Sequence, residues 1–182
     1  FRPRTFEAIV AGIVTAIERA DADLSPGDIR LSTGRVDGAN VNRALMAFER
    51  NPLADKEQFP GGVDSSMTVL RFERNGTPIG VLSWFATHGT SMTNTNRLIS
   101  PDNKGYAAYL WEHDWAGRSS LDKAAGEPGF VAGFAQGNAG DMSPNVGAGD
   151  GYGPANNEFA NTRIIGSRQA IGARDIFDSA QT

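Results

Sequence analysis

Apolar residues recur at three- and four-residue steps near the start of the chain. The stripe consists of Phe6, Ile9, Val10, Ile13, Val14 and Ile17. This spacing places the six side chains on one side of a helix over residues 3–24, and we expect that side to pack into a core. Helical patterns also cover residues 40–49, 102–115 and 157–177. In the helix at 102–115 the expected inward residues are Tyr106, Tyr109, Leu110 and Trp115.

Strands are predicted where apolar and polar positions alternate. Residues 28–36 alternate, and residues 66–73 and 79–86 flank an Asn75-Gly76 pair. Asn-Gly between two such runs indicates a tight hairpin turn, because both turn residues need a positive φ. Residues 79–86 and 130–135 are apolar almost throughout, which is typical of strands buried on both faces. Helices interleaved with strands indicate an α/β (mixed α+β) fold, in which helices cover β-sheet layers.

The composition limits the classes of function. Lys and Arg number 17 and Asp and Glu number 21, which gives a net charge of −4 with neutral histidines. A mildly acidic chain lacks the basic surface that nucleic acids select, so we expect no nucleic-acid partner. The chain has no cysteine, which excludes disulfides, thiolate nucleophiles and Cys-ligated zinc. Its length of 182 residues suits one domain.

Polar loops follow the two apolar strands, and the first loop holds a histidine. Ligands of open α/β sheets collect at the carboxyl ends of the strands. His88 comes directly after residues 79–86, where an imidazole could serve as a metal ligand or a general base. A structural histidine held by hydrogen bonds explains the same position. His113, in the helical pattern at 102–115, is expected at the surface.

The second polar loop holds a serine in the sequence Gly-Asp-Met-Ser-Pro-Asn. Gly140 and Pro144 predict a tight turn, which could place the hydroxyl of Ser143 beside a metal or an oxyanion. Alternatively, the side chains of this turn bond to their own backbone. Arg43 is a further candidate, because it could hold an acidic or carbonyl group. Its alternative is a surface ion pair of little energetic weight.

Three segments together resemble the neutral ceramidases. They are Thr-His-Gly-Thr-Ser-Met at residues 87–92, Asp-Asn-Lys-Gly-Tyr-Ala at residues 102–107, and Asn-Ala-Gly-Asp-Met-Ser-Pro-Asn at residues 138–145. Residues 6–18 and 161–166 are similar as well, and the likeness runs over nearly the whole chain in the same order. The resemblance implies hydrolysis of the amide bond of ceramide to sphingosine and a fatty acid, with zinc (Zn²⁺) as the cofactor.

The resemblance also implies roles for single residues. His88 matches a zinc ligand of the family, Ser143 matches its essential serine, usually assigned as the nucleophile, and Arg43 matches an arginine important to activity. The family's other zinc ligands are a second histidine, a glutamate and a tyrosine, and no motif here matches them. We also expect no part of the family's C-terminal β-sandwich domain within these residues. We therefore expect residues 1–182 to form a single partial domain from the middle of a catalytic domain, inactive alone and partnered by the rest of that domain.

A two-tailed lipid amide as substrate has further implications. It needs an apolar cleft with a few polar groups at its base, and the candidate wall residues are Met92, Leu98, Ile99 and Met142. It also implies contact with a membrane or micelle surface, and family members are expected to be secreted. Two other functions remain open: a metal-independent serine hydrolase that uses Ser143 and His88, and a non-catalytic ligand-binding module.

Overall fold

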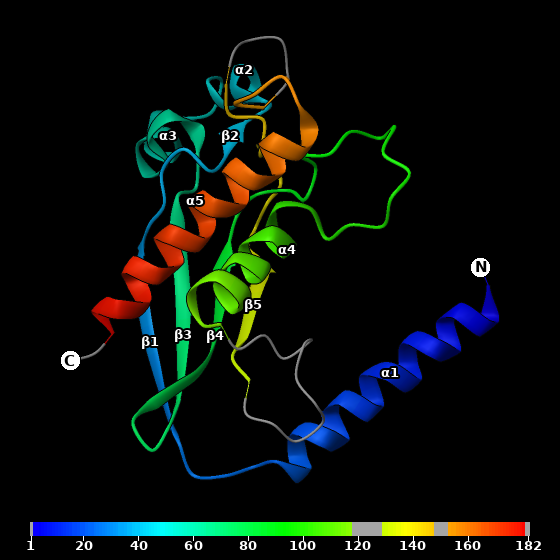
Figure 1. The fold of residues 1–182 in the computed structure, drawn as a ribbon. Coiled ribbons are helices and arrows are strands. Elements are labelled where there is room, and N and C mark those ends of the chain that lie inside the picture. The colour runs from blue at the N-terminus through cyan, green and yellow to red at the C-terminus, as the bar shows by residue number, and fades with distance from the viewer. Residues whose placement is uncertain (1, 118–128, 148–152, 181–182) are drawn as a thin grey trace.

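A mixed sheet forms the centre of the molecule. The structure is a computed structural model that describes residues 2–117, 129–147 and 153–180. Within these residues the sheet contains β1 (Asp28–Arg35), β3 (Ser66–Arg74), β4 (Thr77–Phe85) and β5 (Val131–Gln136), in the order β1-β3-β4-β5 (Figure 1). β1, β3 and β4 are antiparallel neighbours, whereas β5 runs parallel to β4. The expected α/β fold is confirmed.

β3 and β4 form the predicted hairpin. Asn75 and Gly76 at its turn have φ angles of 52° and 73°. Both values lie in the left-handed region, where asparagine and glycine are the residues with the least strain. The strands expected at 28–36 and 130–135 are confirmed as β1 and β5.

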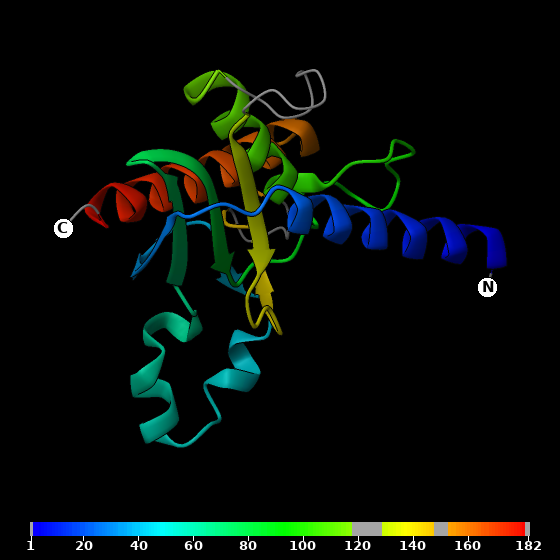
Figure 2. The same ribbon diagram turned by 90° about the horizontal axis from the view of Figure 1, so that it is seen from below.

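Two helices cover one face of the sheet (Figure 2). They are α4 (Asp102–Tyr109), which continues as a π-helical segment over Leu110–Trp115, and α5 (Glu158–Ser179). The core between helices and sheet is apolar and includes Met67, Val69, Val81, Phe85, Trp111, Ile176 and Phe177. The predicted inward residues of the first helix are partly wrong, since Tyr109 is exposed and Trp111 is buried. The wider π turn changes which residues after Tyr109 face the sheet.

The side chain of Asn157 caps α5, which confirms the helix expected over residues 157–177. Its Oδ1 accepts hydrogen bonds from the N–H groups of Phe159 and Ala160 at 2.9 and 3.1 Å. A side-chain acceptor at this position satisfies backbone donors that have no partner within the helix.

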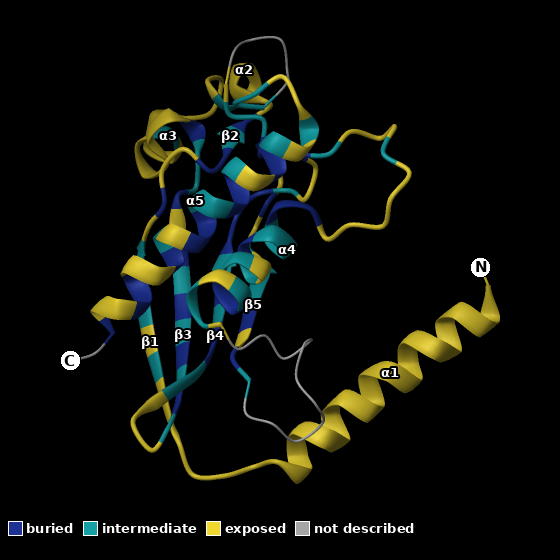
Figure 3. Ribbon diagram, viewed as in Figure 1, coloured by how far each residue is buried: buried dark blue, intermediate teal, exposed yellow. Residues whose placement is uncertain are grey.

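The first helix lies apart from the sheet. α1 (Pro3–Ala22) has the expected bounds within two residues, but it extends away from the rest of the chain and is exposed throughout (Figure 3). Its apolar stripe is 42–64% exposed, so the expectation that it packs into a core is wrong for this chain. An apolar stripe on a helix indicates that the helix packs against another apolar surface, but it does not indicate which segment forms that surface. Across the described residues, no helix combines the length and the hydropathy that a membrane crossing requires.

The sheet face opposite α4 and α5 is apolar as well. Ile29 pairs with Phe72, and Leu31 pairs with Leu70, so these four side chains share that face. Ile29 and Leu31 are exposed, while Phe72 and Leu70 are half-buried. The prediction that residues 79–86 are buried on both faces therefore holds only for the face that the helices cover.

Residues 40–49 form a strand and a short helix instead of one helix. β2 (Val41–Asn42) comes first, followed by α2 (Leu45–Phe48), α3 (Leu53–Gln58) and the 3-10 turn η1 (Pro60–Gly62). β2 pairs antiparallel with β6 (Met142–Ser143). Because the partner strand lies about a hundred residues further along the chain, local periodicity could not predict this pairing.

Candidate functional site

The candidate site lies where β4 and β5 end. The two strands are parallel neighbours, and their last pair is Phe85 with Gln136. Beyond this pair, Gly137 N donates to Phe85 O at 3.0 Å and His88 N donates to Met142 O at 3.0 Å. The loop after β4 therefore lies against the loop after β5, as the rule for strand ends predicts.

The imidazole of His88 is held by a backbone carbonyl. Its Nε2 lies 2.9 Å from Gly140 O, and the residue is half-buried. A carbonyl oxygen only accepts hydrogen bonds, so this bond requires the proton on Nε2 and leaves the lone pair of the neutral ring on Nδ1. Metal-binding histidines commonly donate their second ring N–H to such a carbonyl. The hydrogen bond from Nε2 to Gly140 O is compatible with a metal ligand that binds through Nδ1. It is equally compatible with a structural histidine that is held in place by hydrogen bonds.

Ser143 is buried in β6, where it pairs with Val41 of β2. Its Oγ accepts a hydrogen bond from Asn145 N at 3.2 Å. This is the local turn bond that the structural alternative predicts. A hydroxyl that accepts one hydrogen bond still has a proton that it can donate. The bond from Asn145 N therefore leaves the Ser143 hydroxyl able to donate a hydrogen bond or to lose its proton to a base.

Arg43 contacts the same loop. Its Nη2 donates to Gly140 O at 3.3 Å and its backbone N donates to Asp141 O at 2.9 Å. Gly140 O thus receives both the imidazole of His88 and the guanidinium of Arg43, and Gly140 has a φ of 43°, in the region that favours glycine. The structure brings the three predicted site residues together around residues 140–143, although they are far apart in the sequence.

A group of buried polar residues at the start of α4 was missed in the sequence. Asp102 Oδ1 accepts from Ser91 N at 3.0 Å, and Oδ2 accepts from Met92 N at 2.8 Å. Asn103 and Lys104 follow, and both side chains point into the interior near the end of β4. Polar residues at a helix start usually cap it or face water, so no pattern other than the Asp-Asn-Lys-Gly motif itself indicated that these side chains point inward.

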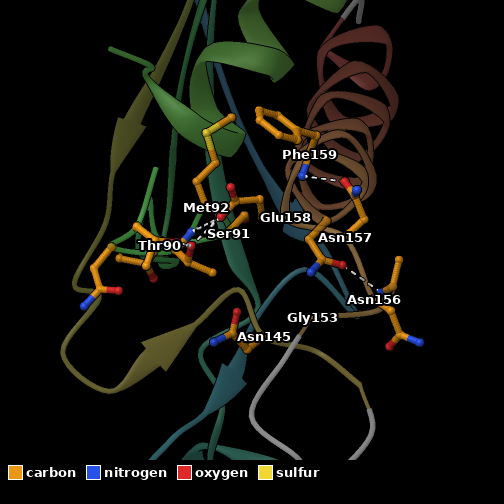
Figure 4. Close-up of a pocket in the computed structure, with 14 residues that line it drawn as sticks. Thr90, Ser91, Met92, Asn145, Gly153, Asn156, Asn157, Glu158 and Phe159 are labelled. Atoms are coloured by element: carbon orange, nitrogen blue, oxygen red, sulfur yellow. Dashed lines mark hydrogen bonds between the residues drawn. The ribbon is translucent and has the colours of Figure 1, made fainter. Parts of the chain in front are cut away.

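A cavity of about 1040 Å³ opens beside these loops (Figure 4). It is lined by residues 90–95 and 155–159 with Asn145, Gly153 and Asn161. Hydroxyl and amide side chains predominate, so it differs from the apolar cleft expected for a lipid. Of the expected wall residues only Met92 lines it.

Other expected wall residues point elsewhere. Leu98 and Ile99 are exposed and Met142 is buried. At the rim of the cavity, Thr93 N and Oγ1 both donate to Glu158 Oε2 at 2.6 Å. These two hydrogen bonds hold the pKa of the Glu158 carboxyl below its ordinary value. They join the loop after β4 to the first turn of α5.

The described residues contain no complete metal site. Among them, no three His, Cys, Asp or Glu side chains lie close enough to hold a metal. Zinc takes three or four protein ligands, so His88 alone is not a complete site. His113, the other histidine, is half-buried and stacks on Tyr109 with 4.4 Å between ring centroids.

Comparisons with known proteins agree with the fold and the motifs. The family model for the N-terminal part of neutral/alkaline non-lysosomal ceramidases matches residues 1–182. The chain is 53% identical over 170 residues to the neutral ceramidase of Mycobacterium tuberculosis and 50% identical over 182 residues to that of Pseudomonas aeruginosa. These matches cover 91% and 100% of this chain but 26% of each relative.

Solved structures give the same result. A structure described as ceramidase complexed with C2 superposes on the whole chain with a TM-score of 0.84 at 49% identity, and the match covers 27% of that structure. The crystal structure of the neutral ceramidase from Pseudomonas aeruginosa gives a TM-score of 0.82. The chain thus spans about a quarter of the length of the proteins that it matches.

Proposed function

Since this chain belongs to the neutral/alkaline non-lysosomal ceramidase family, we propose that the polypeptide carrying it hydrolyses the amide bond of ceramide to sphingosine and a fatty acid. One observation carries the proposal for these residues: His88, Arg43 and Ser143 gather around one loop at the ends of two parallel strands. The proposal includes secretion and action at a membrane or micelle surface.

Ser143 supplies the hydroxyl that faces the amide. It either attacks the carbonyl carbon, so that the C–N bond breaks and the amine leaves with a proton, or it donates a hydrogen bond while water attacks. In the first case an acyl-enzyme forms on Oγ and water then releases the fatty acid. Arg43 binds a carbonyl or acidic group, because its guanidinium is exposed beside the same loop.

Zinc is part of the proposal. His88 would hold it through Nδ1, with Gly140 O fixing the ring, and further ligands would come from outside this chain. When bound, zinc would polarise the amide carbonyl and lower the pKa of a bound water. The role of residues 1–182 is then to place one ligand next to the serine.

The experiment measures zinc content and ceramide hydrolysis of the intact polypeptide that carries these residues. We expect Ser143→Ala to lower kcat by at least about 100-fold with unchanged zinc content. His88→Ala should lose both zinc and activity. Matched controls are Ser179→Ala, at the far end of α5, and His113→Ala, both of which should keep activity and zinc.

Other outcomes would favour the alternatives. Activity that survives a strong chelator would favour the metal-independent hydrolase that uses Ser143 and His88. Normal turnover of Ser143→Ala would remove the serine from the mechanism, and zinc retained in full by His88→Ala would remove His88 as a ligand.

A further inference from the structure

Lys104 connects the ends of the two strands that carry the site. Its Nζ donates to Phe85 O at 3.0 Å, to Ala135 O at 3.1 Å and to Gln169 Oε1 at 3.3 Å. Phe85 is the last residue of β4, and Ala135 is the residue before the end of β5. One ammonium group therefore bridges β4 and β5 immediately before the loops of His88 and Ser143 begin.

Asn103 holds the backbone of His88 itself. Its Nδ2 donates to His88 O at 2.9 Å and to Ser91 Oγ at 3.0 Å, and the residue is fully buried. Its Oδ1 accepts from Gln169 Nε2 at 2.9 Å. Gln169 of α5 therefore contacts both Asn103 and Lys104, and its amide orients both side chains.

This arrangement is costly for a purely structural core. Burying an ammonium group is unfavourable, and the partners of Lys104 given above are neutral oxygens. Burial lowers the pKa of Lys104 to about 8. Asp102, which precedes Asn103, has a positive φ of 55°, in a region that residues other than glycine adopt infrequently. Backbone strain and costly buried polar groups persist where they fix a particular geometry.

We propose that Asn103 and Lys104 are positioning residues of the proposed hydrolysis site. Lys104 fixes the spacing of the β4 and β5 ends, and Asn103 fixes the carbonyl of His88, so that the imidazole stays against the Gly140–Ser143 loop. The inference rests on the proposed function for its catalytic consequence, but the positioning itself can be measured without substrate.

The first test observes the ring of His88 in the 182-residue chain by ¹⁵N NMR. The chain has two histidines, so His113→Gln assigns the two sets of signals. In the wild type we expect His88 to carry its proton on Nε2. Asn103→Asp has the same shape but lacks the amide donors, and it should mix the tautomers of His88 and leave those of His113 unchanged.

A second variant provides an independent test in case Asn103→Asp does not fold. Lys104→Met removes the ammonium, and it should speed amide hydrogen exchange at Gly137 and His88, whose N–H groups join the two loops. Exchange in the β3–β4 hairpin should be unchanged. An unaltered His88 ring in Asn103→Asp, or unaltered exchange at both amides in Lys104→Met, would overturn the positioning role.

The catalytic consequence is measured in the intact polypeptide. We expect Asn103→Asp to lower kcat by about 10- to 100-fold, with KM changed by less than about 3-fold. The matched control is Ile176→Ala, a core variant that lowers stability and contacts β1 near Gly34, away from the loops. It should keep its kcat once the folded fraction is accounted for.

The outcomes separate the two proposals. If Asn103→Asp loses no more kcat than Ile176→Ala, the positioning role is wrong even though the enzyme is a ceramidase. If the wild type cleaves no ceramide while the NMR and exchange changes occur, the proposed function fails and the positioning of His88 stands.

Discussion

At the scale of single residues, Lys104 makes stability depend on pH. Burial lowers its pKa from 10.5 to about 8, so between these values the unfolded chain holds a proton that the folded chain has released. The free energy of unfolding therefore rises with pH over this range, by up to about 3 kcal/mol from this residue. Below about pH 8 the folded chain bears the full cost of burying the charge.

Urea unfolding of the wild type and of Lys104→Met tests this prediction. We expect the wild type to gain stability relative to the variant between about pH 7.5 and about pH 10. Tyrosines and other lysines titrate in both proteins, so their contributions cancel in the difference. A difference that does not change with pH would show that Lys104 titrates in the fold as it does in water.

The candidate site residues and the residues that contact them could be predicted from the sequence to different degrees. His88 and Ser143 could be found because each follows an apolar strand, and parallel strands bring their ends to one edge of the sheet. Arg43 was a candidate both for its chemistry and for its match to the family, but its position depends on the β2–β6 pair, which no local pattern shows. The sequence could not predict that Asn103 is buried and Lys104 half-buried, since both depend on the packing of α5 over them.

At the scale of helices, two helical glycines in different surroundings lead to opposite predictions. A Cβ on Gly166 of α5 would lie 2.6 Å from Asn103 O and 2.9 Å from Tyr106 Cδ1, so Gly166→Ala must push α5 away from α4. We expect a loss of about 1–3 kcal/mol in the free energy of unfolding. Gly12 of α1 has no atom within 4 Å of such a Cβ.

Gly12→Ala is the matched control, because it removes a helical glycine where there is space. It should raise the stability of α1 by about 0.5–1 kcal/mol through the lower backbone entropy of alanine. Circular dichroism and urea unfolding measure both variants. A Gly166→Ala protein as stable as the wild type would mean that α4 and α5 pack less closely than described.

Helix and strand patterns in the sequence predicted most elements correctly. The hairpin and β1 follow from alternation and from Asn75-Gly76, and α5 follows from its periodicity and its asparagine cap. Two features were not predictable. The π turn after Tyr109 departs from regular helical spacing and contacts β5, where Ala132 N donates to Glu112 Oε1 at 2.8 Å, and β2 is defined by its distant partner β6.

At the scale of the whole molecule, two apolar surfaces are exposed within residues 2–117, 129–147 and 153–180. One is the stripe of α1 and the other is the sheet face that carries Ile29 and Leu31. The sequence predicts the apolar stripe, the alternation of residues 28–36 and the α/β class, but it cannot say which apolar faces the chain itself covers. Exposed apolar patches of this kind promote association between molecules.

We expect the isolated 182-residue chain to self-associate at micromolar concentration, as measured by sedimentation velocity. Ile9→Gln with Ile13→Gln should reduce association while changing the free energy of unfolding by less than about 0.5 kcal/mol, since both residues are exposed. Ala8→Gln with Thr15→Gln, outside the stripe on the same helix, should leave association unchanged. Equal association of the two double variants would show that the stripe is not responsible.

The parallel pairing of β4 with β5 also has a kinetic consequence. The β3–β4 hairpin closes a turn of two residues, whereas β5 can join β4 only after the long connection between Phe85 and Val131 has been brought back to the sheet. Closing a long connection lowers the conformational entropy of the chain before any stabilising contact has formed, so strand pairings of this kind form slowly. We therefore expect the loops that carry His88 and Ser143 to come together near the end of folding, so that a partly folded chain with a complete hairpin would still lack the contact between them.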